Sequence, residues 1–490
     1  MSRTRSLSPS SGPRRFVLDC LAITMLTRRN LLTLGALLPV FGRAEQSYRV
    51  YTEHPRLWLT PRRLKLLKRE RERESIRWQQ LGLLVPDRQA PELALLRALE
   101  FQVADRPEAG KLAVEWALGR TPQTTPDPAQ LRLLAVVFDW CYPLLEAVDR
   151  ARLAGRMARG IQAPAAGSGL ASFSAAALAA IALADDWPGS EQALATAFEK
   201  KWPETYLPAF RQGRAIPTPA ERVAFLELCH ALRDNLHLDL WQQAPAFFRQ
   251  FPLYLLLSYY PAPVTIASHP FRQTAAAPGS QPDPAMEGEL ARRTDLLTVA
   301  YETNSVETQF LQGWITHDLY RLRMPSAAPY EFLWMNPYQP GLSYHAVPLY
   351  LHDEIGGTLL ARSSWDDDAA WVGYRDRKLE LFADSERSGV EPSAKPAPVV
   401  FQQLAVAAAS GEAAFAVRVI EGEDVFVVGL EPGNTYWVRS GQSGFVPLEA
   451  GKGGILRLRA ELGSQTEFEI KTADPAPPPP PPTPQRKRKK

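Results

Sequence analysis

The chain has 490 residues, of which 45% are hydrophobic and 22% charged, and its formal net charge is +3. This length is enough for two or three domains with a large core, and the composition is that of an ordinary globular protein. Part of the small positive charge lies in the terminal run 486–490. The rest of the chain has no basic excess of the kind that binds nucleic acid, so no nucleic-acid partner is expected.

The N-terminal segment 1–44 has the pattern of a leader. Within it, 25–44 reads MLTRRNLLTLGALLPVFGRA, where paired arginines precede an apolar run and a small-residue exit. This order predicts an export signal, and the paired arginines indicate the twin-arginine route. The apolar run is too short to span a bilayer, so no stable transmembrane segment is expected after cleavage. We therefore expect an exported bacterial protein, periplasmic or secreted; the alternatives are an uncleaved anchor and a chance apolar stretch.

From about residue 55 to residue 320 the apolar spacing is helical. Pro- and Gly-bearing segments separate the predicted helices, and short connectors indicate helical hairpins. Cys141 and Cys229 lie in helical apolar patterns, either as a disulfide pair or as two buried free thiols. The main predicted helices cover 91–118, 128–161, 170–185, 190–200 and 218–231.

From about Pro348 the apolar period changes to two, which predicts strands. So many short strands at close spacing indicate an antiparallel sandwich. The final PAPPPPPPTPQRKRKK has no capacity to form a core and is typical of a disordered or extended tail. The predicted strands cover 358–364, 370–375, 379–383, 399–409, 414–421, 424–429, 435–439, 454–460 and 466–471.

These patterns divide the chain into four parts. After the leader at 1–44, a helical domain is expected at 45–335 and a β-sandwich domain at 336–473. The sandwich is expected to include a small terminal β unit, and the Pro-rich basic tail occupies 474–490.

Several stretches resemble the heparinase II/III-like group of polysaccharide lyases. HPRL at 54–57 with LTP at 59–61 resembles the start of the α/α toroid in that group, and FDWCY at 138–142 resembles its YDW helix. Residues 357–371 resemble the first strands of its sandwich, and 429–471 resembles its closing β-domain. The order of these stretches is more specific than any one of them. The resemblance implies a multidomain α-then-β protein, with an incomplete α/α toroid followed by an antiparallel β-sandwich.

The resemblance also implies an activity, namely cleavage of acidic, uronate-containing polysaccharide by β-elimination in the cleft between toroid and sandwich. That reaction needs a group that neutralises the uronate carboxylate, a base, and an acid that protonates the leaving oxygen. In the family the toroid supplies an Asn or His and a Tyr, and the sandwich supplies a His. Here no His follows His352, and 383–395 stands where the family has a His-containing stretch. The alternative is a non-catalytic carbohydrate-binding or envelope scaffold protein that has lost the sandwich His.

The densest polar cluster is CHALRDNLHLDL at 229–240. His230 and Asp234 are four residues apart and share a helical face, as a base and its orienting carboxylate would. Asn235 is a candidate for neutralising a uronate, and Arg233 can hold a carboxylate by a bidentate contact. The alternative is a helix end with local hydrogen bonds.

Aromatic residues and histidines gather where the helical and β patterns meet. Tyr344 is the predicted base or acid, His345 or His230 its partner, and Asn336 a second candidate neutraliser. Ligand pockets favour such domain interfaces. The alternative is an aromatic plug that fixes the two parts together.

Further aromatic residues are predicted to bind substrate, because aromatic faces suit the apolar sides of sugars. Trp314 and His317 share one helical face, with an inward-facing helix as the alternative. Trp334 and Tyr338 belong to the irregular segment before Tyr344.

No cofactor or metal is expected. The sequence has no Zn-type Cys/His set, P-loop, dinucleotide fingerprint or nucleophile elbow. The run 366–368 of three Asp can bind calcium but is more typical of a hairpin cap.

Overall fold

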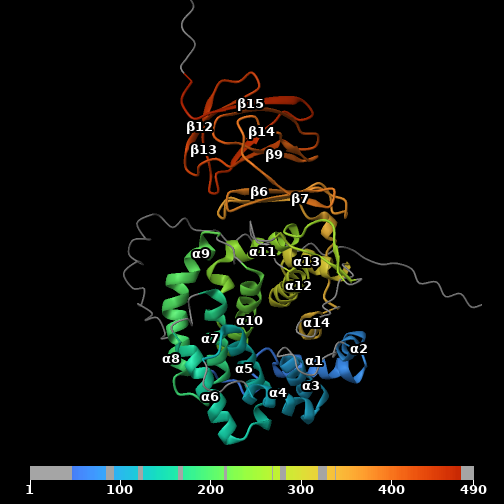
Figure 1. Ribbon diagram of the computed structural model, residues 1–490, viewed down its shortest axis with the longest axis vertical. Helices are drawn as coiled ribbons and strands as arrows, with labels where there is room; N and C mark the ends of the chain where they lie inside the picture. The colour runs from blue at the N-terminus through green and yellow to red at the C-terminus, as the bar shows by residue number, and fades with distance from the viewer. Residues whose placement is uncertain are drawn as a thin grey trace, which may run out of the picture. The chain divides into compact units, whose positions relative to one another are not determined.

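The structure is a computed structural model that describes residues 47–83, 93–119, 125–163, 169–213, 218–266, 269–275, 283–317, 328–336 and 338–475. The export signal expected at 25–44 and almost all of the tail expected at 474–490 lie outside these residues. Residues from Tyr48 onward belong to one compact unit. Helices come first in this unit and β-strands follow, as the change of apolar period predicted (Figure 1).

Several helices begin at a proline that follows a polar cap. α1 begins at Pro61, after Thr60, whose hydroxyl accepts from the Arg63 N–H. α5 begins at Pro128, after Asp127. Proline suits the first turn because its missing N–H would have no helical partner there. The described helices are α1 (Pro61–Glu72), α2 (Ile76–Leu83), α3 (Leu93–Ala104), α4 (Pro107–Gly119), α5 (Pro128–Trp140), α6 (Ala147–Gln162), α7 (Leu170–Ala182), α8 (Ser190–Thr196), α9 (Leu207–Arg211), α10 (Pro219–Leu236), α11 (Pro245–Leu257), α12 (Pro284–Tyr301), α13 (Val306–His317) and α14 (Ala328–Trp334).

Two of the predicted helices are each divided into two. The prediction of one helix over 91–118 is wrong, because Asp105 takes a φ of 52° and Pro107 then begins a new helix. The prediction over 128–161 is also wrong, since a turn containing Pro143 separates α5 from α6. Proline lacks the N–H that a continuous helix would need at this point. None of the described helices has both the length and the apolar character that crossing a bilayer requires.

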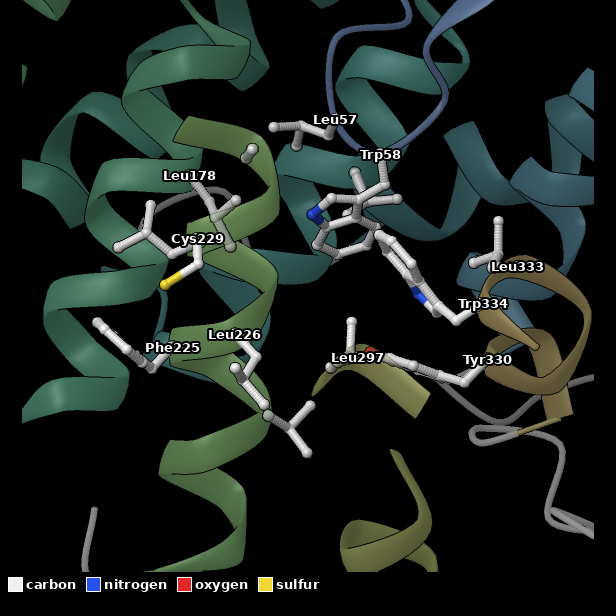
Figure 2. Close-up of a cluster of buried hydrophobic side chains, with 14 of the residues drawn as sticks. Leu57, Trp58, Leu178, Phe225, Leu226, Cys229, Leu297, Tyr330, Leu333 and Trp334 are labelled. Carbon is white, nitrogen blue, oxygen red and sulfur yellow. The ribbon is translucent and has the colours of Figure 1, made fainter. Parts of the chain in front are cut away.

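The helical part closes on itself through side-by-side helices. Each helix in the series α3, α5, α7, α10, α12 and α14 contacts the next, and α14 contacts α3. A cluster of buried side chains from α7, α10, α12 and α14 packs with Leu57 and Trp58, both fully buried (Figure 2). Cys229 belongs to this core, and it and Cys141 are both buried free thiols, which excludes the disulfide.

The described strands of the β part form three sheets, besides the short pair β1 (Val264–Ile266) and β2 (His269–Phe271). The first has the order β3-β4-β5-β6-β7, the second β14-β11-β9-β8 and the third β10-β15-β12-β13. The strands of 429–471 are thus shared between two sheets. The bounds are β3 (Tyr350–Asp353), β4 (Thr358–Arg362), β5 (Trp371–Arg375), β6 (Lys378–Ala383), β7 (Glu386–Val390), β8 (Val399–Val400), β9 (Leu404–Ala408), β10 (Ala413–Arg418), β11 (Asp424–Val428), β12 (Thr435–Ser440), β13 (Val446–Glu449), β14 (Leu456–Arg459) and β15 (Gln465–Lys471).

The second sheet lies between the other two and is covered on both faces. Val406 and Phe426 pack on the first sheet, whereas Ala405 and Val425 pack on the third. Neighbouring side chains of a strand point to opposite faces, so β9 and β11 must be apolar at every position between the two layers. These two strands pair in parallel, and the other paired strands are antiparallel. The single strand predicted over 399–409 is divided by a turn into β8 and β9.

The first sheet packs its other face on the helical part. Leu360, Trp371 and Phe382 belong to the helical core, and the Trp371 indole N–H donates to the Leu257 carbonyl oxygen at 2.7 Å. Tyr260, just after α11, stacks on Phe382 with ring centres 5.1 Å apart. This contact positions the loops of the first sheet next to α13, where the sequence placed a candidate site.

Candidate functional site

The two stretches that resemble parts of the toroid lie against each other. Asp139 is fully buried and accepts hydrogen bonds from the Arg56 N–H at 2.9 Å and the Leu57 N–H at 2.7 Å. The His54 Nδ1 lies 2.6 Å from the Asp139 carboxylate. The Trp140 indole N–H donates to the Leu57 carbonyl oxygen at 2.8 Å. These contacts join the two motifs, so the motif pair anchors the segment that precedes α1.

A buried ion pair that the sequence analysis did not single out connects three helices. Glu227 on α10 is fully buried and accepts from the Arg132 guanidinium on α5 through both carboxylate oxygens, at 2.5 and 2.6 Å. The Tyr330 hydroxyl on α14 contacts both groups. The Trp58 indole N–H donates to the Glu227 carbonyl oxygen at 3.0 Å. No local pattern announces this network, because its members are far apart along the chain.

His230 lies within the same core. Its side chain is fully buried, its Nε2 lies 3.0 Å from the Leu297 carbonyl oxygen, and its ring centre is 4.2 Å from that of Trp334. Burial lowers the pKa of His230 well below 6.5, and the nearby Arg63 and Arg233 charges act in the same direction. The imidazole is therefore neutral at physiological pH, with Nε2 as the donor. Because the His230 side chain is fully buried, a substrate in solvent does not reach it to exchange a proton.

The state of His230 predicts a pH dependence of stability. Below about pH 6.5 the unfolded chain binds a proton at His230 that the folded chain does not bind, so the free energy of unfolding falls as pH falls. The expected slope is about 1.4 kcal/mol per pH unit. Urea unfolding between pH 5 and pH 7 should show this component in the wild type and not in His230→Gln. The same substitution at exposed His237 is the control, and identical slopes in all three proteins would contradict the prediction.

Asn235 and Arg233 are also bonded within the helical part. The Asn235 amide donates to the Arg56 and Ala231 carbonyl oxygens at 3.1 and 2.8 Å, and its oxygen accepts from the Thr52 hydroxyl. The Arg233 guanidinium donates to the Tyr301 carbonyl oxygen at 2.6 Å. The contacts of Asn235 to Thr52 and Arg56 hold the segment before α1, and the helix ends only after Leu236, where His237 takes a left-handed conformation.

Trp334, Asn336 and Tyr338 line a cavity of about 250 Å³, here called the helical cavity. Its other walls come from α1, α2 and the end of α12, and include Arg63, Glu70, Arg77 and Gln339. Trp334 is buried, whereas Asn336 and Tyr338 are exposed.

His345 lines a different cavity of about 600 Å³, here called the junction cavity. Residues 345–349 form one wall, 363–366 from the β4–β5 connection a second, and Gln402 with Gln403 a third. His345 is exposed, and its ring stacks on that of half-buried Tyr344, with centres 4.3 Å apart. The junction cavity thus lies where the chain passes from the helical part to the β part.

Tyr344 is surrounded by aromatic rings. Trp314 on α13 lies edge-to-face with it at 5.0 Å, and Trp365 at 5.4 Å. The Arg362 guanidinium lies over the Trp365 ring at 4.2 Å, and that of Arg272 over Trp314 at 5.3 Å. The sequence analysis included Trp314 but missed Arg362 and Trp365, although RSSW at 362–365 opens a connection between two predicted strands.

The electrostatic environment favours a negative charge near Tyr344. Burial and the neighbouring Arg272 lower the pKa of Arg362 to about 10, while Tyr344, Asp366 and Asp367 act in the opposite direction. Arg362 therefore remains cationic at neutral pH. A cation close to a tyrosine favours its phenolate form.

The candidate residues therefore belong to separate neighbourhoods. His230 and Asn235 are buried in the helical part, and Arg233 is half-buried. Trp334 contacts His230 and also lines the helical cavity. His345 lines the junction cavity, and Tyr344 stacks on His345 beside it. The side chain of His317 lies outside what the structure describes. His352, the last His, lies on β3 against Phe426, with ring centres 5.0 Å apart.

Metal ligands do not gather in the part of the chain that the structure describes: no three His, Cys, Asp or Glu side chains there form a group able to hold an ion. The Asp366 carboxylate instead accepts from the Ser364 hydroxyl at 2.9 Å, and Asp367 accepts from Arg272 at 3.0 Å.

Comparison with known proteins shows no family for this chain. No protein-family model matches the sequence, and no curated protein matches it. The solved structure of a glycoside hydrolase matches with a TM-score of 0.21 and 10% sequence identity, covering 79% of this chain and 73% of that one. A similarity this low carries no argument about function, and the function is inferred below from the residues.

Proposed function

We propose that the protein binds uronate-containing polysaccharide at the junction cavity and cleaves it by β-elimination, with Tyr344 as the base. The observation that carries this proposal is the position of Tyr344, which lies beside His345 and close to the buried Arg362 cation. A tyrosine next to a fixed positive charge can act as a base at neutral pH. Trp365, which lines the same cavity, has an aromatic ring of the kind that suits the apolar face of a sugar.

The reaction assigns one role to each group. The Tyr344 phenolate removes the proton from the carbon that bears the uronate carboxylate. The bond between the adjacent ring carbon and its glycosidic oxygen then breaks. A carbon–carbon double bond forms in the sugar, and His345 supplies the proton that the leaving oxygen takes up. The amides of Gln402 and Gln403, which line the junction cavity, hydrogen-bond to the carboxylate and stabilise the charge that develops there. Gln402 and Gln403 thus have the neutralising role that the sequence analysis proposed for Asn235 and Asn336.

The test is a panel of uronate-containing polysaccharides, with the unsaturated product followed by its ultraviolet absorbance. Tyr344→Phe is expected to reduce turnover at least 100-fold, because it removes the acid–base group and keeps the ring. Tyr51→Phe makes the same change at a residue that is 74% exposed and should leave the rate unchanged. An active Tyr344→Phe variant would overturn the assignment of the base.

A specific observation favours a second candidate, a non-catalytic carbohydrate-binding protein. His230 and Asn235, which the sequence placed in the active site, are hydrogen-bonded inside the helical part. Absence of product on every substrate, with polysaccharide still retained in a pull-down, would establish this second function in place of the first.

A further inference from the structure

The wall of the helical cavity includes a cation, Arg63, that forms no ion pair within the described part of the chain. Arg63 donates to the Trp58 carbonyl oxygen at 2.8 Å, and its guanidinium lies over the Trp334 ring at 4.1 Å. Among the residues that the structure describes, no carboxylate forms an ion pair with Arg63. The stacking fixes the position of the guanidinium, and the remaining N–H groups of Arg63 have no acceptor among these residues.

The charged neighbours do not remove this positive charge. Arg77, across the cavity, is already paired with Glu70 at 3.2 Å. Burial, the largest effect, and the Arg233 charge lower the pKa of Arg63 to about 10, while Asp234, which forms no ion pair with it, acts in the opposite direction. Arg63 is therefore charged at neutral pH.

Two N–H groups in the wall of the helical cavity also lack acceptors among the described residues. The amide nitrogen of Gln339 and the indole nitrogen of Trp334 are both buried and have no acceptor among the described residues. Leaving a buried N–H without an acceptor costs about 1–3 kcal/mol. Both residues line the same cavity as Arg63, so a ligand with acceptor oxygens would supply partners that the described residues do not give to these N–H groups.

We propose that the helical cavity is a second ligand site, which binds the carboxylate of a single sugar-acid residue through Arg63. Its volume of about 250 Å³ suits one sugar ring. Exposed Asn336 and Tyr338 form the outer part of its wall and offer an amide and an aromatic face to the sugar hydroxyls and the ring. The choice of a sugar acid rests on the proposed function, but the site is distinct from the junction cavity and needs no catalysis.

The test is a calorimetric titration with sodium glucuronate in the Tyr344→Phe background, where binding is measured without turnover. Glucose tests the need for the carboxylate, and inorganic phosphate tests the need for the sugar. Arg63→Gln is expected to weaken glucuronate binding at least tenfold. Arg62→Gln makes the same change at the adjacent exposed residue of α1 and should leave the affinity unchanged.

A second variant keeps the test decisive if Arg63→Gln does not fold. Gln339→Glu replaces an amide donor by a carboxylate of the same size and should also weaken binding at least tenfold. Gln79→Glu, at an exposed position of α2 outside the cavity, is its control. Equal affinities in variant and control, or equal binding of glucose or phosphate, would overturn the proposal. Glucuronate binding without any lyase product would leave it standing while the β-elimination fails.

Discussion

Glu227→Gln is expected to lower the free energy of unfolding by about 3–5 kcal/mol, the cost of breaking a buried ion pair by removing one partner. The carboxylate is fully buried and binds Arg132 through both oxygens. Gln keeps the size of the side chain but removes the charge, so the Arg132 cation is left uncompensated between α5, α10 and α14. Urea unfolding followed by circular dichroism measures the loss.

Two further variants identify the cause of this loss. Glu227→Gln combined with Arg132→Met removes both charges, and the double variant is expected to be more stable than Glu227→Gln alone. Glu108→Gln removes one partner of an exposed pair, in which Glu108 is 82% exposed, and should cost less than about 1 kcal/mol. A loss below about 1 kcal/mol for Glu227→Gln would show that the buried pair does not hold α5, α10 and α14 together.

Asp139→Asn is expected to lower the free energy of unfolding by about 2–4 kcal/mol. The carboxylate accepts from two backbone N–H groups and lies 2.6 Å from the His54 imidazole. An Asn offers one acceptor and turns an NH₂ group toward donors, so a buried N–H loses its partner. Because this segment carries Leu57 and Trp58 into the helical core, the loss affects packing as well as hydrogen bonding.

The control for Asp139 is the same chemical change at Asp127. Asp127 caps α5, where its carboxylate accepts from the Gln130 N–H at 2.9 Å. Asn caps a helix about as well as Asp, so Asp127→Asn should change stability by only a few tenths of a kcal/mol. Similar losses in the two variants, measured by urea unfolding, would contradict the anchoring role of Asp139.

The order of helices and strands could be predicted from the sequence, because the period of apolar residues reflects which faces are buried. Pro61, Pro128 and Pro219 each begin a helix after a polar cap. The apolar runs at 404–408 and 424–428 became strands covered on both faces. Breaks were less predictable, since Asp105 has a left-handed conformation that its residue type allows but does not require.

The candidate site shows what only the tertiary structure decided. Trp334 and Tyr344 are ten positions apart, and the sequence placed them in one site. The segment between them crosses α13, where the Leu342 N–H donates to the Gln309 carbonyl oxygen at 2.9 Å. Gly341 and Gly313 allow this close approach, because a Cβ on Gly341 would lie 2.6 Å from the Gly313 nitrogen.

This crossing separates Trp334 from Tyr344, although the two residues are close along the sequence. Trp334 remains with Arg63 in the helical cavity, and Tyr344 reaches Trp365 at the junction cavity. The sequence by itself determined that helices precede strands, because the period of apolar residues is a local property. Which side chains meet depends on the packing of α13 against a distant segment, and on charges such as Arg63 and Arg362 that approach from elsewhere in the chain. Those contacts have no periodicity along the chain, so the fold alone decides them.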